Sequence, residues 1–244
     1  MGNHAAAPIV KRYLAAVRLE QSTTATLPKR TTPLFRNKLS KVSRHIAYKL
    51  CNPHISIVQR YILQRDLAFF NLLANTGDRA GDLDALLVDQ ICMLLDKEGV
   101  MLNITKGKIT NMCDPRVVIV LRSSSSEFCP VQELEKYINY CSDNGLDLAS
   151  GYVFRPLDGH SKLSMKSFTS SAANVRSKLY LKNLNLWDGE TSHSTRSGCV
   201  LTLSWLGLDK EKIKQHVGWK SDFMFQHYTA GKAMCDKFTS AKVL

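Results

Sequence analysis

The sequence predicts a mainly helical protein with one small antiparallel β-sheet, an α+β fold. Two observations support this prediction: apolar residues recur at helical spacing over most of the chain, and three short strand-like stretches lie close together in its middle. The 244 residues are 44% hydrophobic and 22% charged, which allows an ample core and excludes a largely disordered chain. No run of 18 apolar residues occurs, so a membrane-spanning protein is excluded.

The N-terminal region is expected to hold two basic helices. A short helix is predicted over residues 8–20, a polar Thr/Pro linker over 21–33, and a second helix over about 34–50. The apolar stripe of the second helix has spacings of four, three and four, and consists of Phe35, Leu39, Val42 and Ile46. We interpret residues 1–52 as a basic helical N-terminal region and residues 53–244 as a second, larger domain.

The larger domain is predicted to begin after Asn52-Pro53. An apolar helix over 55–75 is expected to end at Gly77, and Arg79 opens a further helix. Strands are predicted at 91–95, 100–105 and 117–121. Further helices are predicted at 130–141, 163–180, 194–206, 209–216, 221–228 and 231–240.

The positive charge is concentrated at the N-terminus. The chain has a formal net charge of +12, and residues 1–60 hold eleven Lys and Arg against the single acid Glu20, a net charge of +10. Neutralisation of phosphates by Lys and Arg drives nucleic-acid binding, so this asymmetry favours a polyanionic partner. A solvated basic face or an acidic protein partner would give the same pattern. The residues expected to contact DNA are Lys38, Lys41, Arg44 and Lys49, with Lys106 further along the chain.

The seven cysteines are scattered, with no CxxC pair and no spacing typical of zinc ligands. We therefore expect ordinary buried thiols in a reducing compartment, with neither a disulfide framework nor a structural metal.

Four motifs lie in one order along the chain. Arg79 stands in TGDRAGDL; Lys106 and Lys108 stand in LNITKGKI, at a predicted hairpin; SHSTRSG holds His193 and Arg196 at i, i+3; and GWKSDFMFQHY holds Trp219 and Tyr228. In this order and spacing they resemble the tyrosine recombinase (phage integrase) family, over residues 55–230 or so. The N-terminal tail and the Phe154-Arg155-Pro156 sequence also resemble Crypton and DIRS-type recombinases of eukaryotic mobile elements.

The resemblance implies the tyrosine recombinase catalytic-domain fold, preceded by the short basic helical region. It also implies DNA breaking and rejoining through a 3′-phosphotyrosyl intermediate. The catalytic set carried over onto this sequence is Arg79, Lys108, His193, Arg196, Trp219 and Tyr228, with Lys106 as the competitor of Lys108. No cofactor is implied. The implied partners are double-stranded DNA and, in a homotetramer, three further copies of the chain on two DNA sites; a eukaryotic enzyme of this kind would act in the nucleus.

The residue types suit this chemistry. A tyrosine hydroxyl can attack a phosphodiester and store its bond energy in a covalent link. Two arginines offer permanently charged, forked donors to the non-bridging oxygens, while a histidine can position or deprotonate the nucleophile. An indole N–H only donates, so Trp219 can bond a phosphate oxygen but cannot act as a base.

Three other functions share parts of this pattern. A domesticated recombinase could bind DNA without cutting it, and a type IB topoisomerase would use the same chemistry to relax supercoils as a monomer. A non-enzymatic helical scaffold with a basic tail would explain the charge alone.

Overall fold

The computed structural model describes residues 12–13, 15–17, 32–107, 115–124 and 128–229. The chain divides into two compact units, Met1–Arg30 and Thr31–Leu244. In the first unit the described residues are helical, within the helix predicted over 8–20. The elements below all belong to the second unit.

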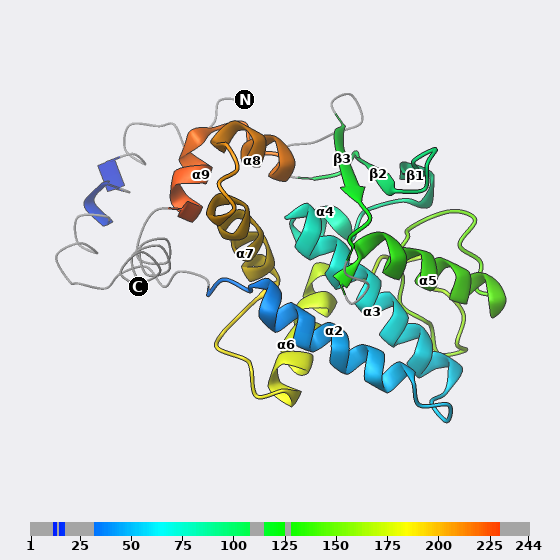
Figure 1. The fold of residues 1–244 in the computed structure, drawn as a ribbon. Coiled ribbons are helices and arrows are strands. Elements are labelled where there is room, and N and C mark those ends of the chain that lie inside the picture. The colour runs from blue at the N-terminus through cyan, green and yellow to red at the C-terminus, as the bar shows by residue number, and fades with distance from the viewer. Residues whose placement is uncertain (1–11, 14, 18–31, 108–114, 125–127, 230–244) are drawn as a thin grey trace. The chain divides into compact units, whose positions relative to one another are not determined.

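Two long helices begin the second unit. Helix α2 (Arg36–Leu50) lies beside helix α3 (Ile57–Thr76) (Figure 1). It buries Leu39, Val42 and Ile46, as the apolar stripe predicted. Ser56 caps α3 by accepting a hydrogen bond from the Gln59 amide, and Gly77 ends the helix. Because α2 shares one hydrophobic core with the elements after it, the boundary predicted at 52/53 lies inside a single compact unit.

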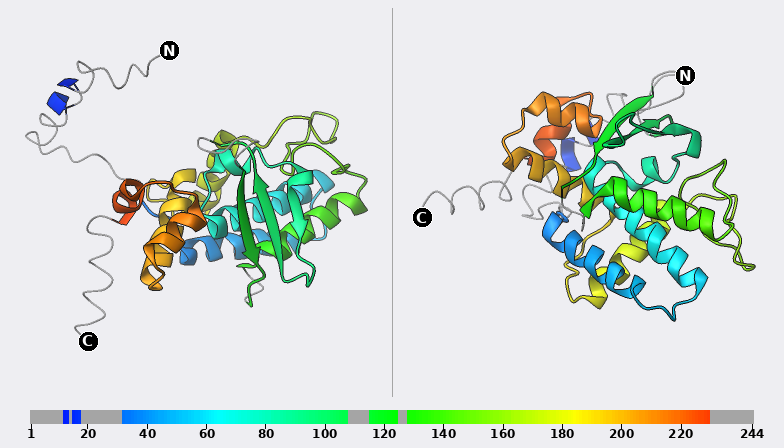
Figure 2. Two further views of the ribbon diagram at one scale, coloured as in Figure 1. Left: turned by 90° about the horizontal axis from the view of Figure 1, so that it is seen from above. Right: turned by 45° about the vertical axis from the view of Figure 1, so that its right-hand side comes forward.

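The three strands form the small antiparallel sheet that the sequence predicted. The strands are β1 (Ile91–Met93), β2 (Gly99–Ile104) and β3 (Arg116–Leu121), and they lie side by side in the order β1-β2-β3 (Figure 2, left). In the register of β2 and β3, Leu102 is opposite Val118. One face of the sheet is buried by Val100, Leu102, Ile104, Val118 and Val120. The tip of the β2–β3 hairpin, residues 108–114, lies outside the described residues.

The elements between these core pieces differ from the predicted ones mainly at α4 and α6. Helix α4 (Ala80–Leu83) is a single turn, followed by the 3₁₀ turn η2 (Val88–Gln90). Helix α5 (Pro130–Asp143) packs along α3. Helix α6 (Ser170–Asn183) begins later than the predicted residue 163, because Thr169 caps it and Asp84 accepts a hydrogen bond from the Ser170 amide.

The last three described helices form a second, smaller core. They are α7 (Ser192–Trp205), α8 (Lys210–Val217) and α9 (Asp222–Thr229). The buried residues of this core are Val200, Ile213, Val217 and Trp219, with Tyr228 among the partly buried residues packed on them. No residue of α9 is fully buried, and Asp222 ties its start to Lys210 and Lys214 of α8 at 2.7 and 2.6 Å. The helix predicted at 231–240 lies outside the described residues.

Across the described ranges, no helix combines the length and the apolar character that crossing a bilayer requires.

A close backbone crossing joins the start of the second unit to α7. The Leu34 amide donates to the Ser194 carbonyl at 2.9 Å, and Leu34 is buried over Gly198. A Cβ atom on Gly198 would lie 2.0 Å from the Leu34 carbonyl oxygen, so only glycine fits at this crossing.

Gly198→Ala should therefore destabilise the protein by roughly 1–3 kcal/mol, the usual cost of overpacking a filled site. Gly81→Ala is the matched control, since Gly81 is also helical and nothing lies within 4 Å of the added methyl group. Urea denaturation of the two variants measures the difference. Equal midpoints would contradict the close crossing.

Candidate active site

Five of the six residues predicted to be catalytic lie in described segments and meet in one place. Arg79 precedes α4, and Trp219 follows α8. His193 lies in the first turn of α7, and Arg196 begins its second turn. Tyr228 lies in the last turn of α9. The site thus depends on the packing of α7, α8 and α9 against the end of α3.

The Tyr228 hydroxyl forms a hydrogen bond with Nε2 of His193. The two ring centroids are 5.7 Å apart, and the Trp219 ring lies 4.9 Å from the Tyr228 ring. Thr191 caps α7 by accepting a hydrogen bond from the His193 amide, which fixes the first turn from which His193 reaches the tyrosine. The hydroxyl is therefore in direct contact with a nitrogen that can accept its proton.

The surroundings keep both partners of this bond neutral. Desolvation raises the pKa of Tyr228 above its ordinary value, although the charges of Arg196 and Arg79 act in the opposite direction. Desolvation also lowers the pKa of His193, and Arg196, Arg79 and His227 add to that effect. A neutral imidazole beside a neutral phenol is the state in which the histidine can act as a base.

Arg196 is a buried guanidinium at the centre of the site, with only 1% of its surface exposed. It donates to the Gly77 carbonyl at 2.6 Å and to the Val217 carbonyl at 2.7 Å, and its Cζ lies 5.1 Å from the Trp219 ring centroid. Burial, followed by repulsion from Arg79, lowers its pKa to about 10, so the group stays charged at neutral pH.

Two buried donors of the site have no hydrogen-bond partner among the described residues. They are Nε of Arg196 and Nε1 of Trp219. An unpaired buried donor is costly, and an acceptor from outside the chain would relieve that cost. With the N-terminus of α7 alongside, these donors favour an anion.

Arg79 borders the same space from the α3–α4 turn. Its side chain is 25% exposed and lies 3.6 Å from the Asp82 carboxylate. Its charge lowers the pKa values of both His193 and Arg196. The site therefore holds two guanidinium groups and one histidine around the tyrosine hydroxyl.

The two candidate lysines are placed differently. Lys106 is exposed at the end of β2, with Nζ 5.9 Å from the Tyr152 ring centroid. Lys108 lies outside the described residues, so the choice between the two lysines stays a prediction.

The basic residues of α2 divide into two groups. The Lys38 ammonium lies 2.5 Å from Asp188 and 2.5 Å from Glu190, and also donates to the Leu186 carbonyl at 2.8 Å. This network fastens α2 to the segment before α7, and the expectation that Lys38 contacts DNA stays a prediction. Lys41 and Arg44 are exposed.

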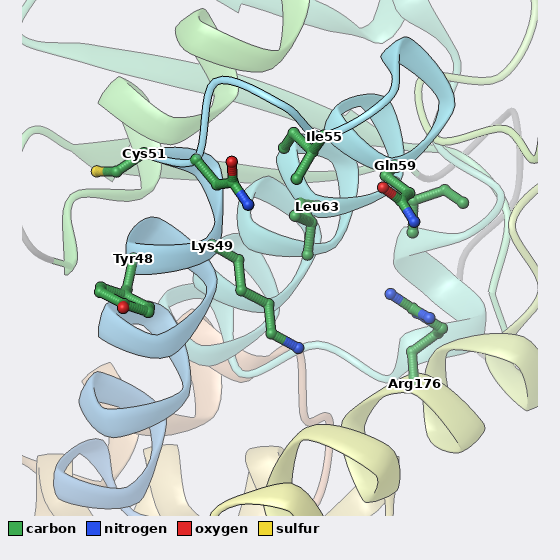
Figure 3. Close-up of a pocket in the computed structure, with 9 residues that line it drawn as sticks. Tyr48, Lys49, Cys51, Ile55, Gln59, Leu63 and Arg176 are labelled. Atoms are coloured by element: carbon green, nitrogen blue, oxygen red, sulfur yellow. The ribbon is translucent and has the colours of Figure 1, made fainter.

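Lys49 is half-buried and lines a cavity of about 630 Å³ between the end of α2, the start of α3 and α6 (Figure 3). Other residues of its wall include Tyr48, Ile55, Leu63 and Arg176. The wall includes none of the residues predicted to be catalytic, so the cavity is separate from the site.

Sequence analysis missed two residues beside the site, Asp78 and Arg116. The Asp78 carboxylate is 1% exposed and pairs with the Arg116 guanidinium. Burial raises the pKa of Asp78 to about 6, against the opposing charge of Arg116. The signal available for Asp78 is its position between Gly77 and Arg79, where a buried acid requires a cation. Nothing in the sequence points to Arg116 as that cation, 38 residues away.

Within the described ranges, no group of three or more His, Cys, Asp and Glu side chains is arranged to hold a metal ion. The absence of a cofactor stays a prediction.

Several solved structures share this fold, although no protein-family model and no curated protein matches the sequence. A XerH site-specific recombinase bound to its difH substrate superposes with a TM-score of 0.58 and 15% identity, over 88% of this chain and 55% of that one. XerA recombinase superposes with a TM-score of 0.60 and 17% identity, over 88% of this chain and 66% of that one. The Tn1549 transposon integrase bound to transposon end DNA superposes with a TM-score of 0.56 and 13% identity, over 87% of this chain and 67% of that one.

These similarities identify the fold. The chain has the mainly helical architecture, with a small three-stranded antiparallel sheet, of tyrosine recombinase catalytic domains. It spans only about half of the XerH recombinase chain, so the similarity concerns one portion of that protein.

Proposed function

We propose that this protein breaks and rejoins DNA by site-specific recombination or integration, through a 3′-phosphotyrosyl intermediate. One observation supports the proposal above the others. The Tyr228 hydroxyl is bonded to His193 beside Arg196 and Trp219, which both keep a buried donor atom free of any described partner. A nucleophile, a base and vacant anion donors are what phosphodiester transfer requires.

The proposed reaction begins with attack of the Tyr228 oxygen on the scissile phosphorus. His193 Nε2 receives the phenolic proton as the new P–O bond forms, and the bond from phosphorus to the 5′ oxygen of the leaving strand breaks. That 5′ oxygen takes a proton from the hairpin lysine, for which we propose Lys108. Rejoining reverses these steps with a 5′ hydroxyl as the nucleophile.

Charge stabilisation falls to the arginines and the tryptophan. As the phosphate passes through its five-coordinate state, negative charge grows on its two non-bridging oxygens. Arg79, Arg196 and the indole N–H of Trp219 are proposed to donate to these oxygens. Because Arg196 is buried and already held by two carbonyls, it needs little reorganisation at the moment of reaction.

The remaining parts of the proposal concern partners and place of action. The residues proposed to contact the DNA backbone are Lys38, Lys41, Arg44, Lys49 and Lys106. A homotetramer on two DNA sites is the proposed assembly. Kinship with eukaryotic mobile-element recombinases, based on Phe154-Arg155-Pro156, and a nuclear location remain predictions.

The nucleophile is tested by Tyr228→Phe, which removes only the attacking oxygen. DNA affinity should hold, while covalent adducts on a nicked suicide substrate should vanish, because the variant lacks the oxygen proposed to form the ester. Denaturing gels of protein mixed with labelled DNA measure the adduct. A heat- and detergent-stable adduct from the Phe variant would show that another residue attacks.

The base is tested by the pH dependence of adduct formation. Because the pKa of His193 is lowered, the neutral form already dominates at pH 6.5, and the second-order rate should fall only as pH drops below that value. His193→Gln should slow cleavage by about 10²–10⁴-fold, the usual contribution of a general base, and remove this acid limb.

His227→Gln is the matched control, since His227 also lies against the Tyr228 ring, at 5.5 Å, without bonding its hydroxyl. The His227→Gln variant should keep the fall in rate at acid pH. A midpoint above 6.5, or loss of the limb in the control, would contradict the role given to His193.

The lysine is tested with a substrate that carries sulfur at the 5′ bridging position, where the leaving group needs no proton. This substrate should rescue Lys108→Ala and do little for Lys106→Ala. The reverse pattern would move the general-acid role to Lys106.

The suicide substrate also separates the alternative functions. A DNA-binding protein without cleavage activity, or a helical scaffold, would trap no adduct. A topoisomerase would trap the adduct on single duplexes without bringing two duplexes together. Electrophoretic detection of paired duplexes alongside the adduct therefore tests recombination as such.

A further inference from the structure

Two arginines join the same two turns of the chain. Arg196 bridges the Gly77 and Val217 carbonyls. Arg116 joins the neighbours of these two residues. It pairs with the carboxylate of Asp78, which follows Gly77, and donates to the carbonyl of His216, which precedes Val217, at 3.2 Å. The first turn leads into Arg79, and the second leads into Trp219.

Arg116 is held firmly between these turns. It is the first residue of β3, opposite Ile104, and its side chain is only 13% exposed. Gly218 lies directly on it: a Cβ atom there would be 2.5 Å from Arg116 Cδ, and Gly218 has a φ of +71° that other residues rarely adopt. The backbone directly before Trp219 is therefore packed against the Arg116 side chain.

His216 completes the connection on the other side. Its Nε2 donates to the Asn75 carbonyl at 2.8 Å, near the end of α3. The turn before Trp219 is thus joined to the end of α3 through His216 and to the Asp78 turn through Arg116. None of these contacts involves an atom that the proposed reaction uses.

We propose that Arg116 is a positioning residue for DNA cleavage, which holds the Asp78 and His216 turns together and so sets Arg79 and Trp219 around Arg196. This inference rests on the proposed function. A guanidinium suits the task because its planar fork reaches a carboxylate and a carbonyl at once, whereas an ammonium is a point donor. A displacement of about 1 Å at a reacting centre can cost about 10²-fold in rate, so a small loosening of either turn is measurable.

The experiment compares Arg116→Lys, Arg116→Ala and Asp78→Asn with the wild-type chain on the nicked suicide substrate. Cleavage at saturating DNA should fall by about 10-fold or more in all three, with Arg116→Lys the mildest, while the dissociation constant for DNA changes little. If Arg116 only stabilised the fold, any loss of cleavage rate would follow the fraction of unfolded protein. Each rate is therefore measured well below the melting temperature of that variant.

Arg122→Ala is the matched control. Arg122 directly follows β3 and forms a forked pair with Glu135 at 2.7 and 2.9 Å, on an exposed surface away from both turns. It removes an arginine–carboxylate pair next to the same strand and should leave the cleavage rate unchanged. An equal rate loss in Arg122→Ala would overturn the proposal.

A substrate with sulfur at the 5′ bridging position distinguishes two ways in which Arg116 could act, through Arg79 and Trp219 or through the hairpin lysine. If Arg116 acts on Arg79 and Trp219, its variants stay slow on this substrate, because only the need for a leaving-group proton has been removed. Restored rates would overturn the inference, since Arg116 would then act through the hairpin lysine. No adduct from the wild-type chain would overturn the proposed function and this inference together, whereas wild-type rates in the Arg116 variants would overturn this inference alone.

Discussion

The site is organised around one buried cation that is paired with backbone carbonyls. Removing a guanidinium from water is costly, and Arg196 offsets that cost through the Gly77 and Val217 carbonyls. Both carbonyls belong to the final turns of helices, α3 and α8, where backbone oxygens have no partner within the helix. The bonds therefore satisfy two helix ends and one buried charge at once, and they bring three helices to the same point.

The same arrangement sets the protonation of its neighbours. Desolvation disfavours the charged form of His193, and the fixed positive charge of Arg196 adds to that effect, so this histidine is more readily neutral than a free one. The charge of Arg196 also favours the ionised form of Tyr228, although desolvation outweighs that effect. The resting site thus holds a neutral base and a neutral nucleophile beside permanent positive charge.

Most of the architecture could be predicted from the sequence, because long amphipathic helices and β-branched strands carry their own periodic signal. The weak points were local. Helix α6 starts at a cap set by Thr169 and by Asp84 from a distant segment, and α4 ends after one turn. The spacing of hydrophobic residues does not report a hydrogen bond from a distant segment or a turn that ends a helix early.

The candidate site divides in the same way. Motif order placed five residues that the structure brings together, since chemistry restricts which residue types can serve. Lys38 looked like a solvated base on a basic helix, but its acidic partners lie about 150 positions further along the chain. Arg116 showed no signal because a buried ion pair is defined by the fold and not by neighbours in sequence.

Helix α9 carries the tyrosine on a weakly attached element. It has no fully buried residue, and its ties are the exposed ion pairs of Asp222, the small core under Trp219 and the Tyr228 bond. Exposed ion pairs contribute little to stability, so the free energy needed to detach α9 is far below that needed to unfold α3, which buries most of its length. In terms of native-state hydrogen exchange, the amides of α9 are therefore expected to exchange through a local opening of lower free energy than the opening that exposes the amides of α3.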